Sequence, residues 1–397
     1  MAAEHVSAAG LVVTLYERMP SVGRKLLMAG RGGLNLTHSE PVEKFLTRYW
    51  ASSDWLTSLL QDFPPEALCT WARGLGQETF VGSSGRVFPR AMKASPLLRA
   101  WLARLAGRNV GLKTGHDWRG WNEAGELIFD SGGETVTVRA DATILALGGA
   151  SWPRLGSNGV WTEILRRRGV ALSPLRPANC GFVVAWSAMF RDAYAGLPLK
   201  SIALNFARHM VRGEAMVSAY GIEGGGVYAL STALSEEIAA KGSALLDIDL
   251  RPDMSLGEIV AKLSTAKRGQ SIANILRKAL HLPPVAINLL REAHGIHLPA
   301  APEALARCVK SAPLKLTAPA PIERAISTAG GIALSFAILP TADNPRRLVR
   351  HWRWLMVATL VVDFAVTLLG QPASYWHDPS TMHEGNSGTR LFLGRNW

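Results

Sequence analysis

The stretch from residue 29 to residue 37, Ala-Gly-Arg-Gly-Gly-Leu-Asn-Leu-Thr, constrains the fold more than any other part of this sequence. It lies downstream of a short apolar segment, residues 11–16, which predicts a β-strand ending at Glu17. This order is typical of a dinucleotide site, because the carboxylate accepts hydrogen bonds from ribose hydroxyls and the glycines let backbone amides approach phosphate. A glycine-rich segment alone is more often an ordinary loop, and a lone glutamate after a strand is more often a solvated side chain. The prediction therefore depends on the order in which the two features occur.

Three segments further along the chain add to this pattern. Residues 82–89, Gly-Ser-Ser-Gly-Arg-Val-Phe-Pro, lead towards Lys93. Residues 140–151 are apolar up to a pair of glycines and predict a buried strand that runs into a glycine turn. A second glycine pair occurs in Ser-Thr-Ala-Gly-Gly-Ile, residues 327–332.

On these residues the chain resembles the bacterial NAD(P)/FAD-dependent oxidoreductases, the BaiN-like or aminoacetone-oxidase-like flavoproteins. The matching segments are 15–18, 23–25, 29–37, 85–89 with Lys93, 145–149 and 327–332, and the resemblance extends to about residue 335. It implies an α/β fold with a Rossmann-like FAD-binding domain of the two-dinucleotide-binding type. It also implies FAD as cofactor, NAD(P)H as electron donor and a small organic molecule as substrate.

The resemblance further implies a set of cofactor-binding residues, each carried over from a matching position. Some would contact the adenosine ribose and the phosphates, and the others would line the pyrophosphate and the flavin or let a later strand pass close to the cofactor. The expected residues are Glu17, Arg24, Lys25, Gly30, Arg31, Gly32, Gly33, Leu34, Asn35, Thr37, Gly148 and Gly149. A surface ion pair is the alternative for Arg31, and a solvated loop lysine is the alternative for Lys93. No residue stands out as a catalytic acid or base.

The sequence departs from the family pattern at both ends. Residues 1–10 read as the remainder of a first helix that stops at Gly10, so the family's first strand and G-x-G-x-x-G loop are expected to be absent. Nothing after Ser335 resembles the family's C-terminal FAD motif. Two interpretations therefore stay open: a FAD-dependent oxidoreductase, or a truncated or fused, non-catalytic flavoprotein remnant tethered to a membrane.

The C-terminal part of the chain predicts contact with a membrane. A basic cluster beginning at Arg346 precedes an apolar run, residues 354–369, that carries one acid, Asp363. We expect residues 346–370 to form a basic flank and a transmembrane or membrane-surface helix, with membrane contact through 352–369. Residues 371–397 would be a polar tail, and the body would be cytoplasmic, anchored to the inner membrane. The alternative is a buried core helix in which Asp363 is paired.

The pattern of apolar residues and glycines predicts how residues 1–340 divide into domains. Residues 1–172 are expected to form the incomplete FAD-binding domain, with a helix at 97–105 and strands between 110 and 138. Residues 173–325 would be an inserted substrate domain, because alternating apolar residues predict a β-barrel-like part at 182–234 and helical spacing predicts helices at 255–310. The glycine run at 221–228 is expected to be a tight turn. Residues 326–340 would return to the FAD domain.

The composition of the chain argues against several classes of function. The net charge is +12, but the arginines are spread along the chain without a nucleic-acid-binding motif, so we expect no nucleic-acid partner. The three cysteines show no C-x-x-C spacing and the histidines no ligand spacing, which predicts neither a metal site nor a disulfide framework. A basic interaction module without cofactor is the third hypothesis.

Overall fold

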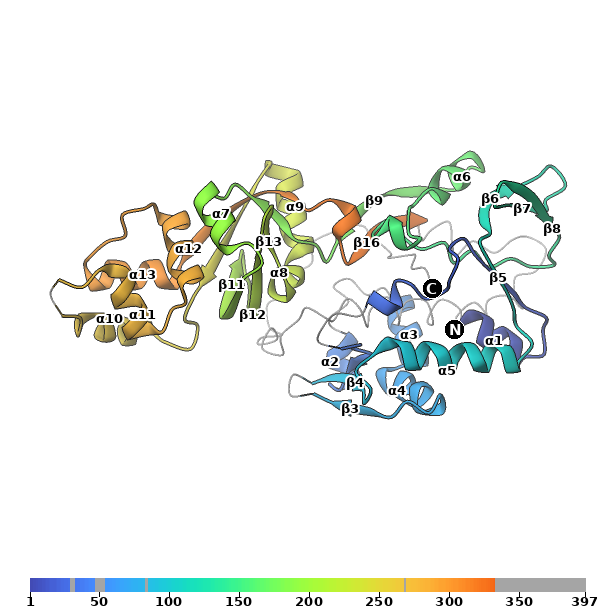
Figure 1. Ribbon diagram of the computed structural model, residues 1–397, viewed down its shortest axis with the longest axis horizontal. Coiled ribbons are helices and arrows are strands. Elements are labelled where there is room, and N and C mark those ends of the chain that lie inside the picture. The colour runs from blue at the N-terminus through green and yellow to red at the C-terminus, as the bar shows by residue number, and fades with distance from the viewer. Residues whose placement is uncertain (29–32, 47–53, 83–84, 268, 333–397) are drawn as a thin grey trace. The chain divides into compact units, whose positions relative to one another are not determined.

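The computed structural model describes residues 1–28, 33–46, 54–82, 85–267 and 269–332. These residues form two compact units, one comprising 1–177 with 322–332 and the other comprising 178–321. Figure 1 shows the helices and strands, coloured by residue number along the chain. The expected membrane helix at 346–370 and the expected tail at 371–397 lie outside the described residues. Among the residues that the structure does describe, no helix has the length and apolarity needed to cross a membrane.

The first unit begins with α1 (Ala2–Ala8), followed by Gly10 in the left-handed conformation at φ +81°, as the sequence predicts for a helix stop. Strand β1 (Thr14–Glu17) then pairs in parallel with β5 (Gly111–Thr114), so that Glu17 lies opposite Thr114. Parallel pairing requires a crossover connection, which here includes α5 (Ala94–Gly107), the helix expected at 97–105. This pair is the α/β part of the fold to which the predicted site belongs.

The other elements of the first unit are short strands and helices. They are η1 (Leu26–Met28), β2 (Thr37–His38), α2 (Val42–Leu46), α3 (Asp54–Asp62), α4 (Pro65–Gly74), β3 (Thr79–Val81), β4 (Arg86–Pro89), β6 (Asp117–Trp121), β7 (Leu127–Ser131), β8 (Glu134–Val138), η2 (Pro153–Leu155), α6 (Trp161–Arg167), β9 (Leu172–Ala178), η3 (Ile322–Arg324) and β16 (Ser327–Ile332). They make three small sheets with the strand orders β2-β4-β3, β6-β7-β8 and β16-β9.

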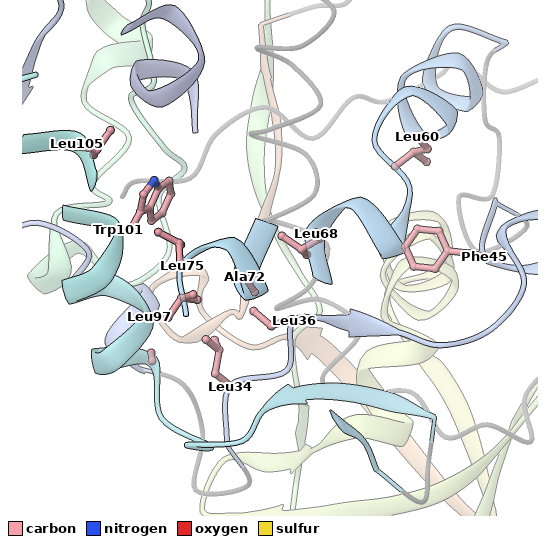
Figure 2. Packing of buried hydrophobic residues seen from close by; sticks show 11 residues of the cluster. Leu34, Leu36, Phe45, Leu60, Leu68, Ala72, Leu75, Leu97, Trp101 and Leu105 are labelled. Carbon is pink, nitrogen blue, oxygen red and sulfur yellow. The ribbon is translucent and has the colours of Figure 1, made fainter. Parts of the chain in front are cut away.

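A hydrophobic core lies between the helices of the first unit and the segment that follows the first glycine run. Figure 2 shows Leu34 and Leu36 of that segment packed with Leu68 and Ala72 of α4 and with Leu97 of α5. All five side chains are at least 95% removed from solvent. Burial of this kind stabilises the fold in proportion to the apolar area removed from water. It therefore fixes the segment that leads away from the first glycine run.

One expected strand is wrong. Residues 143–149 carry the predicted apolar run, but they form no strand with any described segment, and the side chain of Ile144 is 49% exposed. A strand requires a neighbouring backbone to complete its hydrogen-bond ladder, and apolar composition does not supply one. The glycine turn at its end is formed nevertheless, with Gly148 at φ +71°.

The second unit is a small barrel with associated helices. Its elements are β10 (Phe182–Val184), α7 (Ala188–Tyr194), β11 (Pro198–Phe206), β12 (His209–Ser218), β13 (Gly221–Glu223), α8 (Gly225–Ala229), α9 (Ser231–Lys241), β14 (Ala244–Asp249), α10 (Leu256–Ser264), α11 (Ile272–Leu280), α12 (Pro284–His294), α13 (Pro302–Lys310) and β15 (Ala312–Pro319). The strands close in the order β10-β13-β12-β11-β14-β15. A small barrel is present as predicted, but β14 and β15, which help to close it, lie outside the expected range 182–234.

The helical part of the second unit also follows its sequence pattern. A capping box at Ser255 and Glu258 starts α10, and the Ser271 side chain caps α11. Ile259 and Leu263 are buried as the spacing predicts. The expected tight turn at 221–228 is wrong, because these residues form β13 and α8 with only Gly224 between them. Two strand partners, β10 and β12, hold β13 in the barrel and override the glycine content.

Candidate cofactor site

Glu17 closes β1, where the parallel pair with β5 ends. Its carboxylate oxygen Oε1 accepts a hydrogen bond from the backbone amide of Met19 at 2.9 Å. Burial raises the pKa of Glu17, and the Met19 amide and the charges of Arg18 and Arg24 oppose that rise. A carboxylate that is costly to ionise where it stands gains from any further hydrogen-bond donor, such as a ribose hydroxyl.

Two side chains join the segment that follows β1 to the segment that follows the glycine pair at 148–149. The Lys25 amine donates to the hydroxyl oxygen of Ser151 at 2.6 Å, and Ser151 is fully buried. The Arg18 guanidinium donates to the carbonyl oxygen of Gly156 at 3.1 Å. The two predicted segments, around Glu17–Lys25 and around 148–149, are therefore brought together in one part of the first unit.

The second glycine turn is packed closely against β16. A Cβ atom on Gly149 would lie 2.5 Å from the hydroxyl oxygen of Thr328, so no larger residue fits without displacement. The same hydroxyl accepts from the backbone amide of Ala150 at 3.0 Å. The Gly148 carbonyl oxygen accepts from the indole nitrogen of Trp161 at 2.8 Å. These contacts fix the turn on both sides.

The first glycine segment is described from Gly33 onwards, and Gly30, Arg31 and Gly32 lie outside the described residues. Gly33 has φ +96°, and a Cβ atom there would lie 2.7 Å from Met92 Cε, so this position requires glycine. Leu34 packs in the hydrophobic core of Figure 2. Its side chain faces other apolar groups, which favours a supporting role over contact with a cofactor.

Asn35 and Thr37 are also buried. In the amide orientation that satisfies both of its polar atoms, the Asn35 nitrogen donates to the carbonyl oxygens of Val87, at 3.2 Å, and Thr37, at 2.8 Å. Thr37 pairs with Val87 in the sheet. These two residues hold β2 against β4, and their proposed contact with a cofactor stays a prediction.

Three residues near the predicted site were not among those expected from the sequence. Ser151 holds Lys25, and Thr328 supports the glycine turn. Ser157 is fully buried, and its hydroxyl makes no hydrogen bond with any described residue. Ser151 and Thr328 could have been found from their positions in the sequence, because Ser151 follows the glycine pair at 148–149 and Thr328 precedes the pair at 330–331. Hydroxyls beside glycine turns are common, so this signal is not specific.

The known proteins that are similar to this chain include a reductase and a dehydrogenase of solved structure. The 3-dehydro-bile acid delta(4,6)-reductase of Clostridium scindens is 25% identical over 256 residues, which cover 64% of this chain and 61% of the relative. The chain thus spans less than two thirds of that relative's length. The crystal structure of 3-ketosteroid-delta4-(5alpha)-dehydrogenase from Rhodococcus jostii RHA1 in complex with 4-androstene-3,17-dione matches 87% of this chain and 85% of that chain. Its identity is 14% and its TM-score 0.42.

The comparison with family models covers more of the sequence. The model described as the HI0933-like protein Rossmann domain matches residues 1–339. This range contains every residue of the predicted cofactor site and the whole of the second unit. The α/β part, with its parallel strand pair, and the small barrel are therefore parts of one family fold. The chain belongs to the HI0933-like Rossmann family.

Proposed function

We propose that this protein is a FAD-dependent oxidoreductase that acts on a small organic substrate and takes electrons from NAD(P)H. The observation that carries the proposal is the contact of Lys25 with Ser151, which joins the predicted phosphate-binding lysine to the second predicted glycine turn. Membership of a Rossmann family supports it, because that fold binds dinucleotides at the ends of its parallel strands. The curated relative is named as a reductase.

The residues present fit a dinucleotide. Glu17 would accept from the ribose hydroxyls of the adenosine, and Lys25 with Arg24 would neutralise the phosphates. The buried hydroxyl of Ser157, which makes no hydrogen bond with a described residue, supports a further polar group in this part of the unit. At Gly33 and Gly149 the space that a side chain would need is filled by Met92 and Thr328, so close packing within the protein accounts for both glycines.

A bound flavin supplies two-electron transfer, and the protein's part is to bind, orient and shield it. Lys25 would do the binding, since its amine is held by a buried acceptor and its position is fixed. Glu17 would orient the adenosine end, since it stands at the last residue of β1. This proposal assigns no residue to proton transfer in the reaction.

The visible absorption spectrum of the purified chain tests the proposal. We expect flavin bands that survive desalting, bleach when NADPH or NADH is added without oxygen, and return when an organic acceptor is supplied. An unsaturated ketone is the first acceptor to screen, because the curated relative is named as a reductase of a 3-dehydro bile acid. A folded, colourless protein that takes up no added FAD would overturn the proposal and favour the non-catalytic remnant.

Membrane attachment through residues 352–369 is a separate proposal that rests on the sequence alone. The apolar run beside a basic flank supports it. Flotation with vesicles of anionic lipid tests it, with a chain ending at residue 345 as the control. We expect only the full chain to float, and equal behaviour of the two would contradict attachment through this segment.

A further inference from the structure

Ser151 is anchored through both of its neighbours in the chain. The backbone amide of Ala150 donates to the Thr328 hydroxyl oxygen at 3.0 Å. The backbone amide of Trp152 donates to the Glu323 carbonyl oxygen at 3.2 Å. The Ser151 side chain between these two anchors is fully buried. Two hydrogen bonds of its neighbours therefore define where the Ser151 hydroxyl lies.

Both anchors belong to residues 322–332, the segment that returns to the first unit, and this segment is itself held in place. Its strand β16 pairs with β9 of the same unit. The two strands approach so closely that a Cβ atom on Gly330 would lie 2.1 Å from the Pro174 carbonyl oxygen. Close-packed backbone of this kind transmits a displacement instead of absorbing it. The position of Ser151 is therefore set by a segment that lies far along the chain.

The backbone directly after Ser151 is strained. Trp152 has φ +59° and ψ +59°, a left-handed conformation that is unusual for a bulky side chain. Such a conformation costs free energy and persists only where surrounding contacts impose it, as at many ligand sites. Here the bond to Glu323 imposes it, together with a bond that the Leu155 amide donates to the Trp152 carbonyl oxygen at 2.8 Å. The strained residue lies next to the buried hydroxyl that meets a cation.

The hydrogen bond to Ser151 changes what Lys25 can do as a ligand-binding residue. A lysine side chain is long and flexible, so ordering it on a ligand costs conformational entropy. The bond of the Lys25 amine to Ser151, at 2.6 Å, meets part of this cost within the protein itself. An ammonium group has three N–H donors, of which Ser151 takes one, and its compact charge suits phosphate oxygens.

We propose that Ser151 is a positioning residue for cofactor binding: it holds the Lys25 amine where the phosphates of FAD bind, and residues 322–332 hold Ser151. This inference rests on the proposed function, which supplies the phosphates. One competing explanation is that the hydrogen bond only joins two segments of the fold. Another is that Ser151 draws the amine away from the phosphates. The three explanations differ in the effect that Ser151 has on FAD binding with and without the lysine.

Titration of FAD into the full chain, followed by flavin fluorescence, separates these explanations. Ser151→Ala should raise the dissociation constant by about threefold to tenfold, because the amine must then be ordered when FAD binds. In the Lys25→Met background the same substitution should have no further effect, since a positioning residue acts only through the amine. A role confined to the fold would instead add its loss to that of Lys25→Met. Tighter binding by Ser151→Ala would show that the bond draws the amine away.

Thr328→Val tests the anchor without a change at the Lys25–Ser151 bond itself, and it keeps the test available if Ser151→Ala does not fold. It removes the hydroxyl that accepts from the Ala150 amide. We expect the dissociation constant for FAD to rise by about twofold to fivefold, and this rise to vanish in Lys25→Met. An unchanged dissociation constant in folded Thr328→Val would overturn the part assigned to residues 322–332.

The reactivity of the Lys25 amine gives a readout that needs no flavin. Mass spectrometry after brief exposure to acetic anhydride measures the acetylation of each lysine. Acetylation of Lys25 should be faster in Ser151→Ala than in wild type, because the released amine is more mobile, whereas the exposed Lys113 should react equally in both. Ser7→Ala is the matched control, since it removes a hydroxyl of the same unit that donates to the Glu4 carbonyl oxygen at 3.1 Å. It should change neither FAD binding nor Lys25 acetylation.

The outcomes distinguish this inference from the function on which it rests. A folded wild-type chain that takes up no FAD overturns the proposed function and the role of Ser151 with it. If the wild type binds FAD, three results overturn the role of Ser151 alone. They are an unchanged or lower dissociation constant in folded Ser151→Ala, an effect of equal size in the Lys25→Met background, and unchanged acetylation of Lys25.

Discussion

The Lys25 amine donates to the Ser151 hydroxyl across 2.6 Å, although the two residues are 126 positions apart in the chain. Ser151 is fully buried and follows the glycine turn at 148–149. The contact therefore places a cation beside a turn whose backbone is fixed by Thr328 and Trp161. A cation held in place beside a glycine turn is an arrangement that suits the phosphates of a dinucleotide.

Replacement of this cation should weaken cofactor binding. A charged hydrogen bond contributes about 1.5–3 kcal/mol, so Lys25→Met should raise the dissociation constant for FAD by roughly tenfold to a hundredfold. Quenching of flavin fluorescence during titration measures it. Lys113→Met, at an exposed position of β5, is the control and should bind FAD like the wild type. If both variants bind FAD equally well, Lys25 does not contact the phosphates.

FAD binding should depend on pH through Glu17. Burial raises the pKa of this carboxyl, and its ionised form is the stronger acceptor for ribose hydroxyls. FAD affinity should therefore fall as the pH drops through the raised pKa, and Glu17→Gln should bind more weakly and lose this pH dependence. The same titration repeated over a pH series measures it. An unchanged acid limb in Glu17→Gln would assign the dependence to another group.

The raised pKa of Glu17 also predicts a change in stability. The folded, cofactor-free chain binds this proton more tightly than the unfolded chain does, so it loses stability as the pH rises from the ordinary glutamate pKa through the raised one. Glu17→Gln should remove this loss. Urea unfolding on either side of that pH range measures the difference.

The glycine turn should not accept a methyl group. Gly149→Ala places a Cβ atom 2.5 Å from the Thr328 hydroxyl oxygen, and overpacking of this kind costs about 1–3 kcal/mol. Adding Thr328→Gly should recover part of the loss, so a double-mutant cycle should give a favourable coupling of about 1 kcal/mol. Gly107→Ala, at a position where a Cβ atom would meet nothing within 4 Å, is the control. Additive losses in the cycle would show that the two positions do not clash.

The buried carboxylate of Glu4 should be essential to the first unit. It accepts from the indole nitrogens of Trp71 at 3.0 Å and Trp101 at 2.7 Å, and from the Arg104 guanidinium at 2.8 Å. Glu4→Gln turns one acceptor into a donor that faces donors and leaves Arg104 without its counter-charge, which should cost about 3–5 kcal/mol of unfolding free energy. The exposed pair of Glu66 with Arg73 provides the control, since Glu66→Gln should change the free energy of unfolding far less than Glu4→Gln does.

The loss of stability in Glu4→Gln should depend on pH. Burial acts to raise the pKa of Glu4, but the hydrogen bonds from Arg104, Trp71 and Trp101 outweigh it and the pKa is lowered. The stability that Glu4 contributes is present above the ordinary glutamate pKa and is lost as the pH falls through the lowered one. Urea unfolding of wild type and Glu4→Gln should therefore converge on acidification. A constant difference would mean that the charge of Glu4 does not contribute.

Local patterns in the sequence were sufficient to predict several helices and strands. The alternation within 182–234 predicted strands, among which β11 is one, and the segment 97–105 was predicted to be the helix that is α5. Gly10 ends α1 as predicted, because the left-handed conformation it adopts strongly favours glycine. These predictions depend on properties of neighbouring residues, which the sequence states directly.

The same reasoning was wrong where pairing decided the outcome. Residues 143–149 have the composition of a buried strand but have no ladder partner among the described residues. The glycine run at 221–228 has the composition of a turn, yet β10 and β12 hold its first residues as a strand. Composition states what a segment can become, and its neighbours decide what it becomes.

The sequence by itself determined the family and the order of the glycine segments around Glu17, because these are matters of residue type and spacing. Only the tertiary structure placed Ser151 against Lys25, packed Thr328 on Gly149, and put Leu34, which was expected to line the cofactor, in the hydrophobic core. It also brought Tyr220 to Glu223 over Gly181. The physical reason is that hydrogen bonds and close packing act over a few ångströms, so contacts between distant residues exist only once the chain has closed.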